Sequence, residues 1–367
     1  MLDHWLAPVS TEQFTNFQSL STYQLGKRIA VHHEYLPNLS GVQIALLGIG
    51  LERIYPIRQA LYQLNFPFRN LSVADLGNAR RDEPAFLIPI ISELLENGIF
   101  PIIIGPAYDT LQAQFQAYQS KQQLINLGLV DEAIRFDPKQ KDKSDYLYQI
   151  LTNKSPRLFS LGQLAYQSHY TPETAIDFFQ DHHFDLLRLG HIRQQMEAAE
   201  PLIRNVDLLG FNIAAIRYSD APAQQAPNPA GLFIEEACQL CRYAGLSDKL
   251  TSLGIYGYQV EKDQSGQTAQ AIALLIWYFL EGFHNRKKDY PVDNQGLIEY
   301  IVDFKELATQ VTFWKSSKSG RWWMQVPVKT MEKHQRHYLI PCSYQDYLQA
   351  SKGDFPERLF SAYQRFV

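Results

Sequence analysis

Runs of apolar residues alternate with amphipathic stretches along the first three-quarters of the chain. Short uninterrupted apolar runs are typical of strands that are buried on both faces of a sheet. The segments between them carry apolar residues at three- and four-residue spacing, which is typical of helices that cover a sheet. The predicted strands are 42–48, 68–75, 100–105, 124–130, 157–161, 185–189, 208–213 and 253–260. The predicted helices are 58–64, 83–97, 111–123, 146–151, 171–180, 194–205, 232–243 and 268–283.

This alternation predicts right-handed β-α-β crossovers and a mainly parallel central sheet, which defines an α/β fold. The pattern changes near Asn285, beyond which β-branched and aromatic residues dominate. We therefore expect a core domain at 1–284 and a C-terminal extension at 285–367 that packs on the core.

The extension is predicted to contain a β-hairpin followed by helices. The predicted strands are 297–304, 311–314 and 321–326, the hairpin turn is 316–320, and the closing helices are 344–350 and 356–366. Neighbouring residues on a strand point to opposite faces, so we expect one ring of Trp322 and Trp323 to be buried and the other exposed.

The composition is that of an ordinary globular protein, with 46% hydrophobic and 20% charged residues. A formal net charge of -4 argues against a nucleic-acid partner, which usually requires a basic face. No apolar run reaches the roughly 18 residues that a membrane span needs, and the start of the chain (MLDHWLAPV) lacks the pattern of a signal peptide. Three cysteines fit a reducing compartment. We expect a cytoplasmic protein without nucleic-acid or membrane partners.

Common catalytic motifs are missing from the sequence. It contains neither a glycine-rich phosphate loop nor a G-x-S-x-G or H-E-x-x-H motif. Cys238 and Cys241 have the spacing of a redox or zinc motif, but they lie inside a predicted helix without a second pair. Buried free thiols are the expected state of both.

Polar residues that follow the predicted strands form an ordered series of motifs. They are 75–78 (DLGN), 105–109 (GPAYD), 130–135 (VDEAIR), 227–232 (PNPAGL) and Asp263 before Thr268-Ala269. In order and spacing, the series resembles the ureohydrolase family (arginase, agmatinase and formimidoylglutamase), and it is most similar to the formimidoylglutamase branch. The resemblance implies a three-layer α/β/α arginase-like fold over roughly the first three-quarters of the chain.

The family holds two manganese ions with aspartates and two histidines, and the metal pair supplies a hydroxide that attacks a guanidinium or amidine carbon. The resemblance implies that most of the corresponding positions in this chain hold other residue types. The two histidines correspond to Tyr108 and Ala133, and three of the aspartates correspond to Arg135, Asn212 and Ala214. Asp131 is the one ligand of six that remains, and one ligand cannot hold a dinuclear centre.

Two functions follow as hypotheses. The first is a pseudoenzyme without a cofactor, which acts as a binding or assembly subunit, either as a homo-oligomer or with a protein partner. The alternative is a manganese-dependent hydrolase of linear amidines with a rearranged site. That site would be built from four aspartates in loops after strands, Asp109, Asp131, Asp137 and Asp220.

Individual residues of the degenerate site also have structural interpretations. Glu236 corresponds to a glutamate that holds the substrate guanidinium in arginases, but a glutamate in a first helical turn is also favoured by the helix dipole. Asp131 could simply accept hydrogen bonds from nearby amides. We further expect Arg135 or Arg217 to form an ion pair with Asp131 or Asp220, because the loss of two cations leaves carboxylates without positive charge.

Overall fold

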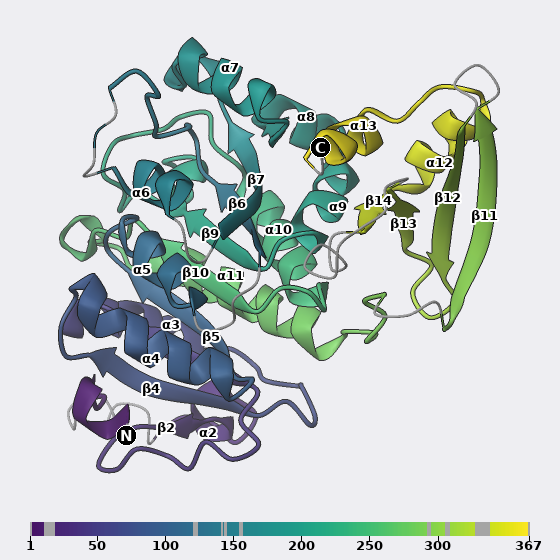
Figure 1. The fold of residues 1–367 in the computed structure, drawn as a ribbon. Coiled ribbons are helices and arrows are strands. Elements are labelled where there is room, and N and C mark those ends of the chain that lie inside the picture. The colour runs from purple at the N-terminus through teal and green to yellow at the C-terminus, as the bar shows by residue number, and fades with distance from the viewer. Residues whose placement is uncertain are drawn as a thin grey trace.

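The computed structural model describes residues 2–10, 19–119, 124–140, 142, 145–153, 157–291, 295–304, 309–326 and 338–365. Its centre is a ten-stranded sheet in the order β1-β4-β3-β5-β10-β9-β6-β7-β8, with β2 also paired to β4 (Figure 1). Every pair is parallel except β1 with β4. The strands are β1 (Leu6–Ala7), β2 (Ala30–Val31), β3 (Ile44–Gly48), β4 (Val73–Ala79), β5 (Phe100–Gly105), β6 (Leu124–Val130), β7 (Arg157–Tyr166), β8 (Asp185–Arg188), β9 (Leu208–Asn212) and β10 (Ser252–Tyr256).

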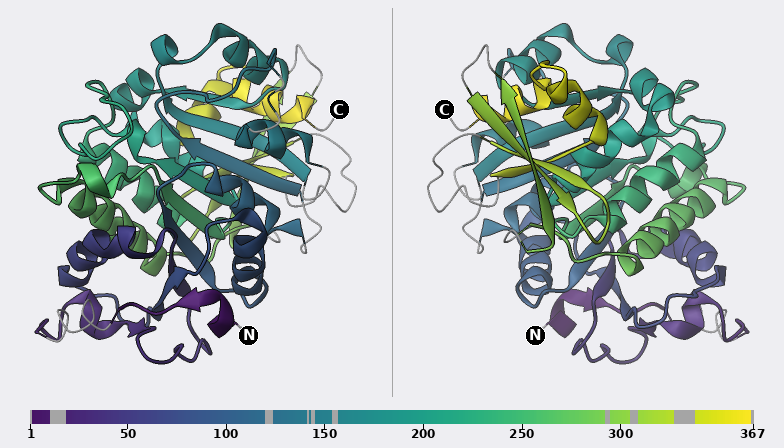
Figure 2. Two further views of the ribbon diagram at one scale, coloured as in Figure 1. Left: turned by 90° about the vertical axis from the view of Figure 1, so that its left-hand side faces the viewer. Right: turned by 90° about the vertical axis from the view of Figure 1, so that its right-hand side faces the viewer.

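Helices cover both faces of this sheet and give three layers (Figures 1 and 2). One face carries α3 (Tyr55–Gln63), α9 (Ala199–Arg204), α10 (Ile234–Leu246) and α11 (Gln267–His284); the other carries α4 (Pro84–Glu96), α5 (Thr110–Gln116), α6 (Tyr146–Thr152) and α7 (Glu173–Asp181). Shorter helices are α2 (Leu25–Arg28) and α8 (Leu189–Gln194). Along β5, Ile102 and Ile104 join one buried cluster and Ile103 joins the other, as the alternation of a strand requires. The predicted α/β class with a mainly parallel sheet is confirmed.

A buried ion pair fixes β4 against α3. Arg58 donates from Nε and Nη2 to the two carboxylate oxygens of Asp75, at 2.8 and 3.1 Å, and the hydroxyl of Tyr62 donates to the same carboxylate at 2.7 Å. Arg58 is 2% exposed and Asp75 is fully buried. A buried charge pair is tolerated only when its remaining polar atoms are also satisfied. Here Arg58 also donates to the carbonyl of Gly77 and to the side chain of Asn78.

Several element boundaries differ from the sequence prediction. The strand predicted at 68–75 is β4, which begins at Val73 and continues past Asp75 to Ala79, because the buried pairing of Asp75 lets polar residues enter a strand core. The strand predicted at 157–161 continues to Tyr166. The helix predicted at 194–205 is shorter in the structure: α8 ends at Gln194, a 3-10 turn spans Met196–Ala198, and α9 spans Ala199–Arg204. Positions 120–123 and 366 of two predicted helices lie outside the described residues.

The last part of the chain forms a separate four-stranded antiparallel sheet in the order β11-β12-β13-β14 (Figure 1). Its elements are β11 (Leu297–Phe304), β12 (Thr309–Ser316), β13 (Trp322–Gln325), β14 (Leu339–Cys342), α12 (Tyr344–Ser351) and α13 (Glu357–Gln364). The predicted hairpin between β12 and β13 is present, and Ser316 donates its amide to the carbonyl of Arg321 at 2.8 Å. None of the helices in the described part of the chain is long and apolar enough to cross a membrane.

The expectation that one of two adjacent tryptophans is exposed was wrong. Trp322 is 6% exposed and Trp323 is 1% exposed. Trp322 stacks on Tyr347 of α12 with 4.9 Å between ring centroids, whereas the other face of the small sheet packs on the core. There the guanidinium carbon of Arg204 lies 4.5 Å from the Trp323 ring centroid. At β13 both faces of the sheet are therefore covered, one by α12 and one by Arg204 of the core, whereas Ile301 on β11 is 57% exposed.

Arg204 fastens the small sheet to α9. The side chain is 4% exposed and pairs with Glu200 at 2.8 Å. Its two terminal nitrogens donate to the carbonyls of Trp322 and Cys342, both at 3.1 Å. One guanidinium thus holds β13 and β14 together and binds both to the core.

Replacement of Arg204 by alanine should lower the free energy of unfolding by about 3 kcal/mol, because two buried carbonyls and Glu200 lose their donor. Urea denaturation measures this change. Arg80→Ala removes an exposed arginine from the end of β4 and is the matched control, with an expected change within about 0.5 kcal/mol. Equal effects of the two substitutions would contradict the role assigned to Arg204.

Removal of residues 285–367 tests the proposed division of the chain. Truncation would uncover Arg204 and the surface around it, and the small sheet buries a cluster of its own that includes Phe313 and Met324. A chain that ends at His284 should therefore melt at a lower temperature or aggregate. If it is as stable and soluble as the full chain, the extension is an independent module.

Candidate functional site

The residues of the degenerate site meet at the carboxyl edge of the parallel sheet. β6 and β9 are neighbours, with Val130 beside Phe211, so Asp131 and Asn212 follow at adjacent positions of that edge. Tyr108 lies in the loop after β5 on the same edge. The carboxyl ends of parallel strands are where an open α/β fold places its ligand site.

The carboxylate of Asp131 is occupied by donors from the protein itself. Its Oδ2 accepts from Nε of Arg135 at 2.8 Å and from Nδ2 of Asn212 at 3.0 Å. Its Oδ1 accepts from the amide of Glu132 at 2.7 Å and from Nη2 of Arg135 at 3.3 Å. A carboxylate has about four lone-pair positions. All four are used, and Asp131 is only 1% exposed.

The charge of this cluster is balanced by Arg135. Burial raises the pKa of Asp131 above its usual value, although Arg135 and Asn212 act in the opposite direction. Burial lowers the pKa of Arg135, but Asp131 and then Glu132 outweigh it, so that the pKa of this guanidinium is raised. Arg135 remains charged and closes the space beside the carboxylate. The predicted ion pair of Arg135 with Asp131 is confirmed.

Aromatic rings fill the space next to Asp131. Tyr108 is 8% exposed, and its ring contacts those of Tyr146 and Tyr256 edge-on, at centroid distances of 5.1 and 5.8 Å. Burial raises the pKa of all three hydroxyls well above the ordinary value. Tyr256 donates to Oε1 of Gln114 at 2.6 Å. Sequence reasoning missed Tyr146 and Tyr256, since nothing in their local pattern links them to position 108.

Two alanines of the degenerate site bring no donor or acceptor side chain. Ala133 and Ala214 are each 8% exposed. The amide of Ala214 donates to Oδ1 of Asn212 at 3.1 Å. Because Asn212 also donates to Asp131, its amide group links β6 to the loop after β9. The positions that correspond to metal ligands therefore carry a hydrogen-bonded and packed structure.

Asp220 and Glu236 support the start of α10. Asp220 accepts from the amide of Ile234 at 3.0 Å and lies 2.8 Å from Nε of Arg217, which confirms the second predicted ion pair. Partial burial acts to raise the pKa of Asp220, but Arg217 and the Ile234 amide outweigh it and the pKa is lowered. Glu236 accepts from the amide of Phe233 at 2.8 Å. Both carboxylates satisfy amides that a helix start leaves without partners.

The four aspartates of the alternative site do not form one cluster. Asp109 is exposed at the start of α5, and Asp137 accepts from the amide of Lys139 and the side chain of Gln140 within a turn. Among the residues that the structure describes, no three histidine, cysteine, aspartate or glutamate side chains could together hold a metal ion. These residues do not fit a pair of manganese ions.

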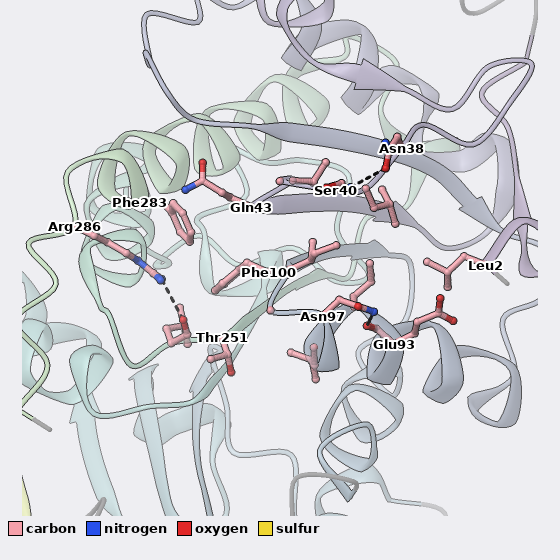
Figure 3. A pocket seen from close by; sticks show the side chains of 18 of the residues that line it. Leu2, Asn38, Ser40, Gln43, Glu93, Asn97, Phe100, Thr251, Phe283 and Arg286 are labelled. Carbon is pink, nitrogen blue, oxygen red and sulfur yellow. Dashed lines mark hydrogen bonds between the residues drawn. The ribbon is translucent and has the colours of Figure 1, made fainter.

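The main clefts of the described structure lie away from Asp131. A cleft of about 700 Å³ opens at the amino ends of β3, β5 and β10, opposite the expected site, between Asn38, Asn97, Phe100 and Arg286 (Figure 3). Arg286 is already engaged there, since it donates to the carbonyl of Leu250 at 3.1 Å. Clefts of about 870 and 630 Å³ lie between the core and the extension. A smaller one, of about 260 Å³, lies at the carboxyl ends of β7 and β8.

Comparison with known proteins defines the fold. No protein-family model and no curated protein sequence matches the chain. Among solved structures, formiminoglutamase from Trypanosoma cruzi with manganese is 17% identical, with a TM-score of 0.61 over 72% of this chain and 99% of its own. Formimidoylglutamase from Bacillus subtilis is 15% identical, with a TM-score of 0.57 over 67% and 88%. Arginase from Bacillus cereus is 15% identical, with a TM-score of 0.54 over 65% and 98%. The chain thus has the arginase-like fold that its motifs predicted.

Substitution of Asp131 by alanine should destabilise the protein, because Arg135, Asn212 and the Glu132 amide lose their acceptor. We expect a loss of about 2–3 kcal/mol in the free energy of unfolding, less than for a fully buried pair, since the Arg135 side chain is 39% exposed. Urea denaturation measures it. The control Asp109→Ala removes an exposed carboxylate and should change the value by less than about 0.5 kcal/mol. If Asp131→Ala is as mild as its control, the network is not structural.

Proposed function

We propose that this protein is a pseudoenzyme of the ureohydrolase family, which has lost the dinuclear manganese site and acts as a binding or assembly subunit. The fold supports the family, and the chemistry at the strand ends supports the loss. The single observation that carries the proposal is the state of Asp131: the one retained ligand position is saturated by an arginine, an asparagine and an amide.

Electrostatics argue in the same direction. A divalent cation near Asp131 would face Arg135, whose pKa is raised and whose charge is therefore held. The positive charges of a metal ion and of Arg135 would repel each other strongly in this partly buried site. To bind a metal, Asp131 would have to release Arg135 and Asn212, and both would lose a buried partner. The alternative hydrolase therefore requires a rearrangement of three side chains, and no observation favours it.

The remaining assignments belong to the same proposal. We place the protein in a reducing compartment, the cytoplasm, because its three cysteines are free and buried. Burial, and then Glu235, raise the pKa of the Cys238 thiol to about 12, so the thiolate that would form a disulfide is scarce at neutral pH. A homo-oligomer or a protein partner would give the subunit its role, with the core at 1–284 and the extension at 285–367 as its two parts.

The dialysed protein should contain no stoichiometric manganese and should release neither urea nor formamide from arginine, agmatine or formimidoylglutamate. Elemental analysis and product assays with and without added Mn²⁺ measure both. Asp131→Ala is the control for adventitious metal, because it removes the retained ligand position. Two manganese ions per chain that are lost in Asp131→Ala, or turnover that scales with Mn²⁺, would overturn the proposal.

A further inference from the structure

β8 is the last strand of the central sheet, and its outer edge is open. The inner edge pairs with β7, from Gly162 beside Asp185 to Tyr166 beside Arg188. In a parallel pair, alternate residues turn their amides and carbonyls away from the neighbouring strand. Among the described residues, positions 185–187 make no backbone hydrogen bond outside this ladder. The outer edge therefore offers unpaired backbone donors and acceptors.

The cleft of about 870 Å³ between the core and the extension is a groove along this edge. All four residues of β8 line its inner wall, and Phe360 and Ser361 of α13 line its outer wall. Gln180 of α7 and His191 of α8 line its two sides, and these helices belong to the opposite helical layers of the core. The groove thus continues the three layers of the core, with the place of a next strand left open.

The outer wall is joined to the sheet at the start of β8. Arg365, which follows α13, donates from Nη1 to the hydroxyl of Ser160 on β7 at 2.6 Å and to the carboxylate of Asp185 at 3.2 Å. Arg188, at the other end of the strand, is exposed. The groove is therefore bounded at one end of β8 and open at the other.

This shape selects a single extended chain as the occupant. A strand added to β8 would lie about 4.8 Å from it, between β8 and α13. The edge strand of a second copy would bring the rest of its sheet with it, and the wall formed by α12 and α13 stands in the way of that sheet. An extended peptide needs only the groove, and its backbone would pair with the outward groups of β8.

The side chains of the groove favour apolar residues in such a peptide. Phe360 lines the groove and is 49% exposed. Leu186 and Leu187 also line it, and as neighbours on a strand they point to opposite faces of the sheet. A peptide with apolar side chains at alternate positions would contact these residues along one of its faces.

The charges of the groove do not select a strongly charged partner. The carboxylate of Asp185 is paired with Arg365. The carboxylate of Asp346 lies 3.9 Å from Nε of Arg358, and both of these residues line the groove. Binding would therefore depend on backbone hydrogen bonds and apolar contact.

We propose that the groove between β8 and α13 binds an extended peptide segment of a protein partner, which adds a strand to the central sheet. The inference rests on the proposed role of a binding subunit and deepens it, because it names the surface and the kind of partner. None of the residues that line the groove belongs to the degenerate site. Its outer wall comes from the C-terminal extension.

Fluorescence anisotropy of the full-length protein with a fluorescein-labelled, C-terminally amidated peptide STVTVTS tests the proposal. The peptide should bind saturably. An analogue with every internal amide N-methylated should not bind, because it has no backbone donors for β8. In amide hydrogen exchange, the bound peptide should slow the exchange of residues 185–188 and leave that of β1, at the opposite edge of the sheet, unchanged.

Substitutions on α13 test the location. Ser361→Arg places a long side chain in the groove and should abolish peptide binding. Phe360→Ala should weaken it about fivefold or more, the usual effect of removing an aromatic anchor. Tyr363→Ala is the matched control, since Tyr363 lies on the same helix, is 37% exposed and does not line the groove. It should leave the affinity unchanged, and thermal melts show whether each variant remains folded.

Absence of saturable binding, or equal binding of the N-methylated analogue, would overturn the proposed strand addition. Equal loss in Phe360→Ala and Tyr363→Ala would overturn its location. A dimer in sedimentation analysis that Ser361→Arg dissociates would overturn the assignment of a peptide and identify a second copy of the chain as the occupant. Manganese content and hydrolase activity test the loss of the metal site separately, so a failure here is distinguishable from a failure of the proposed function.

Discussion

The ion pair between Arg135 and Asp131 determines what the carboxyl edge of the sheet can do. A carboxylate buried at a strand end needs positive charge, which can come from a metal or from the chain itself. In this chain it comes from a guanidinium four residues away, at 2.8 Å, with Asn212 of the neighbouring strand as a further donor. Once these donors are in place, the carboxylate has no lone pair left, and the buried rings of Tyr108 and Tyr146 contact each other nearby. The hydrogen bonds between the end of β6 and β9 thus occupy the edge of the sheet where an open α/β fold places its ligand site.

The central sheet was predictable because its strands are apolar without interruption. The apolar run from Phe100 to Gly105 predicts a buried strand, and β5 spans these residues. The end of β4 was placed too early because a buried Asp75 is acceptable only through Arg58 and Tyr62, which belong to another element. The expectation that one of the rings of Trp322 and Trp323 is exposed was wrong for the same reason, since Tyr347 and Arg204, which cover them, are remote in the sequence. The local pattern of residues predicts that a helix or strand forms. It does not predict which residues, remote in the sequence, pair with or cover its side chains.

In the candidate site, too, residues with a local sequence motif were predicted and their remote partners were not. The motif order identified Asp131, Arg135 and Asn212, and their side chains do meet. The distant partners Tyr146 and Tyr256, whose rings contact Tyr108, carry no local signal. The aspartates of the alternative site fail for a further reason, because a position after a strand does not fix the direction of a side chain. Asp109 is exposed and Asp137 closes a turn.

The C-terminal extension also contacts the exposed edge of the central sheet. β8 is the last strand of the ten-stranded sheet, and an uncovered edge strand is a site for unwanted pairing. Arg365, which follows α13, donates to the hydroxyl of Ser160 on β7 and to the carboxylate of Asp185 on β8. The C-terminal end of the chain is thereby tied to this edge, while Arg204 holds the small sheet to α9. The two attachments lie on different elements of the core, one on α9 and one at the β7–β8 edge. The clefts of about 870 and 630 Å³ between the core and the extension therefore lie beside contacts that join the two parts.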